Sequence, residues 1–313
     1  MELVAPKRQN NKRKHFFTRF LHEAEGWIYV LPVLVGVVIF TFIPMVVSLV
    51  YSLHDYDPTK ATNQLTNFGF QNYVRIFTTG WGEVSHSLFI TFRYAIATVV
   101  VSMVGSYLLA LFLNMKHKGA KVFRVIYYLP CLIPAVASTL LWKDITSVNS
   151  GYINLILEAI GLPRYSFYEA KSTVFPTILM LSAFGFGGSM IPWLASMQNI
   201  PKEYYEAAEI DGANAWQKLI HITIPLTTSM IFYLLITSII SSLQVFSAFY
   251  PLKNGIIDSE INFYVIMVYD RAFKTPNTFS YACALSWFLF FIIAILTGFI
   301  FKTSKWVYYG EDN

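Results

Sequence analysis

Residues 222–252 read ITIPLTTSMIFYLLITSIISSLQVFSAFYPL and contain no Asp, Glu, Lys, Arg or His. Five further long stretches are equally free of these residues, namely 26–53, 94–115, 125–142, 172–201 and 275–301. A helix needs about 20 consecutive apolar residues to cross the hydrocarbon core of a bilayer, and each stretch comes close to that length or exceeds it. The pattern predicts six transmembrane helices.

The composition of the 313-residue chain agrees with this pattern. Charged residues make up 13% of it, against about 25% in soluble domains. A water-soluble globule, a disordered chain and a disulfide scaffold are excluded. Cys131 and Cys283 lie inside apolar stretches, where a thiol behaves as a small hydrophobic group. The net charge of +5 has no folded basic domain to present it, so we expect an all-α membrane protein without a nucleic-acid partner.

The positions of Lys and Arg between the stretches predict the orientation, because short loops rich in these residues stay in the cytoplasm. One side has about twice as many as the other and includes both tails: Lys7, Arg8, Lys12, Arg13, Lys14, Arg19, Lys116, Lys118, Lys121, Arg124, Lys202, Lys218, Lys302 and Lys305. Both termini are therefore expected in the cytoplasm. The run 26–53 is longer than the about 7–15 residues of a signal-peptide core, so we expect a retained first helix.

The expected organisation is a basic cytoplasmic tail, a transmembrane domain and a second cytoplasmic tail, over residues 1–25, 26–302 and 303–313. The expected spans are 26–53, 88–115, 122–143, 173–197, 225–250 and 280–302, with a cytoplasmic loop over 198–224. The longer outer connections, at 54–87, 144–172 and 251–279, contain turn-forming and aromatic segments. They either pack on the helix bundle or form a docking surface for an external partner.

The cytoplasmic loop and the residue after it read NIPKEYYEAAEIDGANAWQKLIHITIP over 199–225. Pro201 suits the start of a helix, where its missing N–H is harmless. Gly212 suits the end, since glycine adopts the left-handed conformation that closes many helices. A second short helix is expected over 213–221, and Pro225 is expected to open the next span. The sequence predicts two short helices hinged at a glycine.

Three interpretations of this hinge compete. A helix lying on the membrane surface usually has a basic polar face. This one is acidic, with Glu203, Glu206, Glu209 and Asp211. A catalytic carboxylate cluster would need a nucleophile or a metal-binding histidine pattern, and none accompanies it. Docking to a protein partner fits best, because Ala207 and Ala208 permit close approach of another surface.

The spacing Glu206-Ala207-Ala208, Gly212, Ile222 and Ile224-Pro225 resembles the EAA loop of permease subunits in binding-protein-dependent ABC importers. Over most of its length the chain is similar to the maltodextrin-permease (MalF-like) branch of carbohydrate importers, through segments 67–73, 151–154, 272–282 and 306–309. The resemblance implies a type I ABC importer permease fold in a bacterial plasma membrane.

The resemblance also implies the partners. They are a second, MalG-like permease subunit, two cytoplasmic ATPases that bind ATP and Mg²⁺, an extracellular solute-binding protein, membrane lipid and a sugar. The implied ATPase-coupling residues are Glu206, Ala207, Ala208, Asp211, Gly212, Ile224 and Pro225. The chain has no G-x-x-x-x-G-K-[ST] phosphate loop, so we expect it to bind no cofactor itself and to be no enzyme. Proton coupling is not expected, because the charge-free stretches contain no Asp, Glu or His.

The candidate substrate path consists of polar and small residues in the fourth and fifth spans: Gly185, Gly188, Ser189, Ser238, Ser241, Ser242, Gln244 and Phe246. Serines at i, i+3 and i+4 align on one helix face, and hydroxyls donate and accept hydrogen bonds as sugar recognition requires. Phe246 is one of several aromatic residues that suit stacking on a sugar ring. Small residues also mediate helix packing in membranes, which is the competing interpretation.

Three other functions remain open at this point. The same branch of importers also transports solutes such as glycerol phosphate. A membrane-embedded enzyme is disfavoured, because the spans contain no acid–base pair and no metal-ligand set. A gated channel is the third alternative, and stimulation of an ATPase by a loaded binding protein would distinguish an importer from both of the last two.

Overall fold

The computed structural model describes residues 27, 29–56, 58, 65–115 and 119–308. The expected N-terminal tail, residues 1–25, lies outside this part. Every regular secondary-structure element in the described ranges is a helix. The only strand-like feature there is an isolated bridge between Asp55 and Thr66. The elements are η1 Val38–Phe42, α2 Ile43–Ser52, α3 Gln71–Phe77, α4 Trp81–Asn114, α5 Ala120–Tyr128, η2 Leu129–Leu132, α6 Ala135–Ile145, α7 Tyr152–Ala159, α8 Lys171–Ala183, α9 Phe186–Gln198, α10 Lys202–Ile210, α11 Ala215–Lys218, η3 Leu219–Thr223, α12 Ile224–Leu226, α13 Thr228–Leu243, η4 Tyr250–Leu252, α14 Tyr264–Phe273, α15 Phe279–Lys302 and η5 Ser304–Trp306.

Three helices of the described chain are long and apolar enough to cross a membrane on their own. They are Tyr29–Ser52, Trp81–Asn114 and Phe279–Lys302. Three further pairs of helices reach that length only when both members are counted, and each pair is bent. The chain is thus an all-helical, multi-pass membrane protein, with three straight candidate spans and up to three broken ones.

The bends depart from the continuous helices expected over 122–143, 173–197 and 225–250. The first pair turns by 98° between η2 and α6, the second by 42° between α8 and α9, and the third by 64° between α12 and α13. The sharpest bend, of 98°, is caused by a proline. Ile133 is extended, with ψ of 129°, because the ring of Pro134 excludes the helical conformation from the residue before it.

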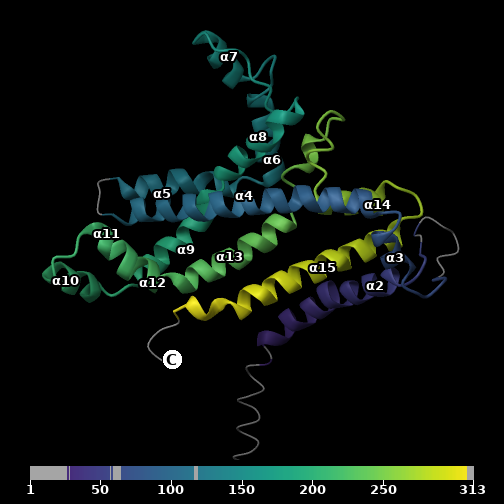
Figure 1. Ribbon diagram of the computed structural model, residues 1–313, viewed down its shortest axis with the longest axis horizontal. Helices are drawn as coiled ribbons and strands as arrows, with labels where there is room; N and C mark the ends of the chain where they lie inside the picture. Colours follow the sequence, from purple (N-terminus) through teal and green to yellow (C-terminus); the bar gives the residue numbers. More distant parts are fainter. Residues whose placement is uncertain (1–26, 28, 57, 59–64, 116–118, 309–313) are drawn as a thin grey trace, which may run out of the picture.

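Helix α4 organises the bundle. It begins at Trp81, earlier than the expected residue 88, and packs against α8, α9, α13 and α14. Figure 1 shows it running along most of the molecule, with α15 and α2 side by side on one flank and the segment around α7 projecting from another. Three apolar cores lie along it, around Ile76 and Leu285, around Tyr94 and Phe263, and around Leu113 and Trp193.

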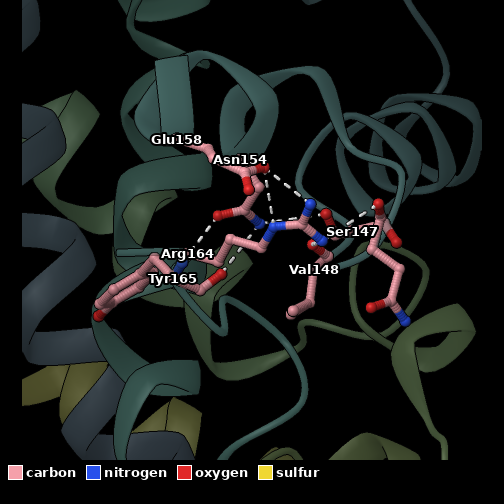
Figure 2. Close-up of polar contacts among 7 residues, drawn as sticks. Ser147, Val148, Asn154, Glu158, Arg164 and Tyr165 are labelled. Carbon is pink, nitrogen blue, oxygen red and sulfur yellow. Dashed lines mark hydrogen bonds and ion pairs between the residues drawn. The ribbon is translucent and has the colours of Figure 1, made fainter. Parts of the chain in front are cut away.

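The outer connection 144–172 is a folded unit (Figure 2). The amide of the buried Asn154 donates to the carbonyl oxygens of Thr146, Ser147 and Tyr165, and its own oxygen accepts from the Tyr165 backbone N–H at 2.7 Å. Arg164 lies beside it and pairs with Glu158 at 2.8 Å. One amide thereby satisfies four backbone groups at once and fixes the fold of this connection.

Among the described residues, the connection 251–279 is held to the bundle by one ion pair and is crosslinked internally by two more. Arg271 of α14 pairs with Glu83 in the first turn of α4. Lys253 pairs with Asp270 at 2.6 Å, and Lys274 reaches the same carboxylate at 3.2 Å. The additional turns at the start of α4 therefore lie among charged groups, which explains why this helix extends beyond the apolar stretch.

The closest approach of two helices depends on Gly187. A Cβ atom there would lie 1.9 Å from the carbonyl oxygen of Tyr127 on α5. We expect Gly187→Ala to force α5 and α9 apart, at a cost of about 1–3 kcal/mol, as for an overpacked core. Gly298→Ala on α15 is the matched control, because a Cβ there meets nothing within 4 Å. Melting of the purified full chain in detergent measures both variants, and equal melting temperatures would contradict the close contact.

Candidate functional site

The expected hinge is present as two helices, α10 and the segment 215–226, joined at Gly212. Gly212 has φ of +76°, and its neighbour Ala213 donates its N–H to the carbonyl of Ala208 at 2.8 Å, which closes α10. The second helix begins with a reciprocal cap: the Asn214 side chain accepts from the Gln217 N–H, and the Gln217 side chain accepts from the Asn214 N–H. Both helix ends are therefore satisfied locally.

The second helix differs from the one expected over 213–221. It starts at Ala215 and continues through a π turn, Leu219–Thr223, to Leu226, so Pro225 lies inside it and not at the start of the next span. A proline has no N–H to donate, and the wider π turn before it accommodates that missing bond. The bend follows at Thr227.

Two side-chain contacts fix the angle between the hinge helices. Lys218 pairs with Glu209 at 2.7 Å, and the Tyr205 and Thr223 hydroxyls lie 3.0 Å apart. The Lys218 ammonium, by hydrogen bond and charge, lowers the pKa of the Glu209 carboxyl below its usual value. This carboxylate is largely exposed, so solvent screens the pair and its contribution to stability is small.

The outer surface of the hinge faces no other part of the described chain. Glu206, Ala207 and Asp211 are exposed and Ala208 is partly so. Ile210 is 88% exposed and Trp216 67% exposed. The hinge thus exposes carboxylates together with large apolar side chains, a composition also found at the edge of protein interfaces. The predicted coupling residues Ile224 and Pro225 lie at its base, half-buried.

A cavity of about 300 Å³ lies between α4, α9 and α13, and four of the predicted path residues line it: Ser189, Ser238, Ser241 and Ser242. The other lining residues are Tyr94, Thr98, Val99, Ser102, Thr237 and Val245. Among the described residues, no hydrogen bond is formed by the hydroxyls of Ser102, Ser189 and Ser238. These hydroxyls are available to a ligand.

A second cavity, of about 510 Å³, shares Tyr94 and Thr98 with the first. Gly185 lines it, as do Trp142 and Cys131. A Cβ at Gly188 would lie 3.7 Å from the Cys131 sulfur, so this glycine faces the same region. Every described residue that lines either cavity is uncharged. Together they form a neutral region lined by hydroxyls and aromatic rings.

Two predicted path residues lie elsewhere. Helix α13 ends at Leu243, so Gln244 follows the helix and is exposed outside both cavities. Phe246 stacks on Tyr250 and packs against Tyr269, facing α14 and α15. Both belong to the fifth span as predicted over 225–250, whereas α13 ends at Leu243.

The sequence interpretation missed the contribution of α4. Tyr94, Thr98 and Ser102 follow at i, i+4 and i+8, the spacing of one helix face, inside a charge-free stretch. That spacing would have identified them. Arg93, their neighbour, does not reach the cavities: its guanidinium lies 3.8 Å from the ring centre of Phe175. Within the described residues no group of three His, Cys, Asp or Glu side chains is placed to hold a metal ion.

Comparison with known proteins agrees with this architecture. Residues 102–305 match the model of the family described as binding-protein-dependent transport system inner membrane component. The chain is 34% identical to a probable ABC transporter permease protein, YesP, of Bacillus subtilis (strain 168), over 92% of this chain and 93% of that protein. It is 27% identical to the lactose transport system permease protein LacF of Rhizobium radiobacter, over 91% and 95%.

The fold is similar to a solved structure as well, that of a bacterial ABC transporter involved in the import of the acidic polysaccharide alginate. The TM-score is 0.80 at 23% identity, with coverage of 93% of this chain and 98% of the other. The likeness extends over the broken helices as well as the straight ones, because it covers nearly the whole chain. The chain is a transporter permease and not an enzyme, and it belongs to the family of binding-protein-dependent transport system inner membrane components.

Proposed function

We propose that the chain forms half of the path by which an ABC importer moves an oligosaccharide or sugar derivative across a bacterial plasma membrane. The observation that supports this most is the pair of uncharged cavities against α4, with free hydroxyls from α4, α9 and α13. Hydroxyl groups donate and accept hydrogen bonds, and aromatic rings such as that of Trp142 offer faces for a sugar ring.

The cavities favour a neutral sugar over an anionic cargo. A phosphate or a uronic acid is ordinarily bound by Arg or Lys, and no such side chain lines either cavity in the described structure. Glycerol phosphate is therefore the weaker alternative. Two relatives are named for transport of neutral sugars, LacF for lactose and the MalF protein of Thermococcus litoralis for trehalose and maltose.

The proposal includes the topology and the partners. We infer six spans, three of them bent, with both termini and the loop 198–224 in the cytoplasm and residues 303–313 as the C-terminal tail. The three long helices and the three bent pairs support this number of spans. The exposed surface of α10 then meets a cytoplasmic ATPase subunit that binds ATP and Mg²⁺. A second permease subunit completes the path, and an extracellular binding protein delivers the sugar.

The energy source is tested by reconstituting the chain with its co-expressed partners in liposomes. We expect uptake of a neutral oligosaccharide to require ATP on the ATPase side together with the loaded binding protein. Uptake driven by a proton gradient without ATP would overturn the importer mechanism, and passive flux without either would indicate a channel.

The hinge is tested at Gly212. We expect Gly212→Val to abolish co-purification of the ATPase, because a β-branched residue does not adopt φ of +76° without strain. Gly212→Asn is the matched variant, since Asn tolerates the left-handed conformation, and it should retain the ATPase. Loss in both variants, or in neither, would contradict a role for the backbone of this hinge.

The cavity is tested at Ser189 and Ser238. We expect Ser189→Leu and Ser238→Leu each to lower sugar uptake at least about tenfold, since each adds bulk and removes a hydroxyl that a site built to bind one depends on. The ATPase should still co-purify. Thr297→Leu on α15, which lines neither cavity, is the control. Normal uptake by both serine variants would remove the cavity from the path.

A further inference from the structure

An apolar groove lies between α5 and α9, separate from the two cavities described above. Its volume is about 410 Å³. Val125, Leu129 and Leu132 form one wall and Ile191, Leu194 and Ala195 are part of the other. Leu132 is 63% exposed and Ile191 44% exposed, so the groove is open. An open apolar groove on a membrane-spanning protein has the shape and polarity to hold a lipid acyl chain.

The polar end of the groove is formed by Arg124, with Gln198 opposite. One terminal nitrogen of the Arg124 guanidinium donates to the carbonyl of Leu113 at 3.3 Å, which fixes the group at the end of α4. Its Nε is buried and has no partner among the described residues. The guanidinium carries further N–H donors beside the buried Nε and the one bonded to Leu113, and a phosphate oxygen accepts charge-assisted hydrogen bonds from such donors.

The two groove helices contribute only positive charge to this end, from Arg124 and Lys121. Lys121 is exposed one turn before Val125. The sequence has no Asp or Glu between Glu83 and Asp144, or between Glu169 and Glu203, so neither groove helix contributes a negative charge. A zwitterionic headgroup gains less here than an anionic one, because its own cation meets Arg124 and Lys121.

The length of the groove suits one leaflet. From Arg124 to Leu132 the helix rises roughly 12 Å, and half of the hydrocarbon core is about 15 Å thick. The 98° bend after η2 turns α6 away and ends the groove there. Helix α9 ends at Gln198, shortly before α10 begins at Lys202, and Figure 1 shows the start of α5 at the same end of the molecule as α10 and α11. The proposed topology assigns that end to the cytoplasmic surface.

We propose that this groove binds one anionic phospholipid of the cytoplasmic leaflet, with the headgroup phosphate on Arg124 and an acyl chain along α5 and α9. Basic pockets between transmembrane helices on the cytoplasmic side are recognised sites for anionic headgroups. The placement in a leaflet rests on the proposed topology. Binding itself does not, so failure of binding in detergent counts against the groove alone.

The test is native mass spectrometry of the purified full chain, titrated with phosphatidylglycerol or phosphatidylcholine. We expect one phosphatidylglycerol to bind in preference to phosphatidylcholine, and Arg124→Gln to weaken phosphatidylglycerol about tenfold and phosphatidylcholine by less, so that the preference is lost. Arg124→Lys should restore part of the preference. Lys302→Gln, an exposed cation on α15 outside the groove, is the matched control.

A second variant covers the possibility that Arg124 matters only for folding. Ile191→Trp keeps every charge and fills the groove, so it should lower the binding of both lipids. An unchanged preference in Arg124→Gln, or unchanged binding in Ile191→Trp, would overturn the proposal. Disulfide crosslinks from Ile191→Cys to the second permease subunit in the assembled complex would also overturn it, by assigning the groove to that subunit.

Discussion

The rest of this structure depends on one constraint: in the interior of a membrane, every backbone N–H and C=O must find a partner within the protein or in a water-filled cavity. A helix break is tolerated only where that condition is met. Two of the three breaks, at Ile133 and at Phe184–Gly185, line the same cavity of about 510 Å³. At the second of them the Gly185 carbonyl accepts from the Gly188 N–H at 3.3 Å and from the Cys131 thiol, a weak donor, at 3.6 Å. The cavity and the breaks therefore explain each other, since the breaks open a space in which their own polar groups can be solvated.

The third break, at Thr227, joins the hinge to the hydroxyl-lined cavity. On one side of it the segment 215–226 is held to α10 through the Lys218–Glu209 pair and the Tyr205–Thr223 hydroxyls. On the other side α13 presents Ser238, Ser241 and Ser242 to the cavity. The Thr227 hydroxyl donates to the Thr223 carbonyl at 2.8 Å, which satisfies a group at the bend. Direct contacts therefore run from α10 through the segment 215–226 and the bend at Thr227 to the helix that forms one wall of the cavity.

The sequence was sufficient for the features that depend on local composition. Charge-free stretches located the membrane segments, and Pro201 and Gly212 located the hinge, because helix ends have chemical requirements that individual residues meet. The directions in which the helices run could not be predicted from the sequence. The length of an apolar run does not state whether the run is straight, and only the closely spaced Pro130 and Pro134 hinted at the 98° bend. Gln244 and Phe246 were assigned to the helix of the fifth span for the same reason, since nothing in residues 222–252 shows that α13 ends at Leu243.

The distribution of charge distinguishes the two uncharged cavities from the groove at Arg124. Along α4, Glu83 pairs with Arg271 at one end, the neutral hydroxyls of Thr98 and Ser102 face the cavities in the middle, and Arg124 binds the carbonyl of Leu113 at the other end. A charge in the middle would cost several kcal/mol to desolvate and would bind a charged cargo too tightly to release. Hydroxyls avoid both costs, because they exchange hydrogen bonds with water and sugar on nearly equal terms. A path lined in this way suits transit, whereas a fixed cation at the membrane edge suits retention.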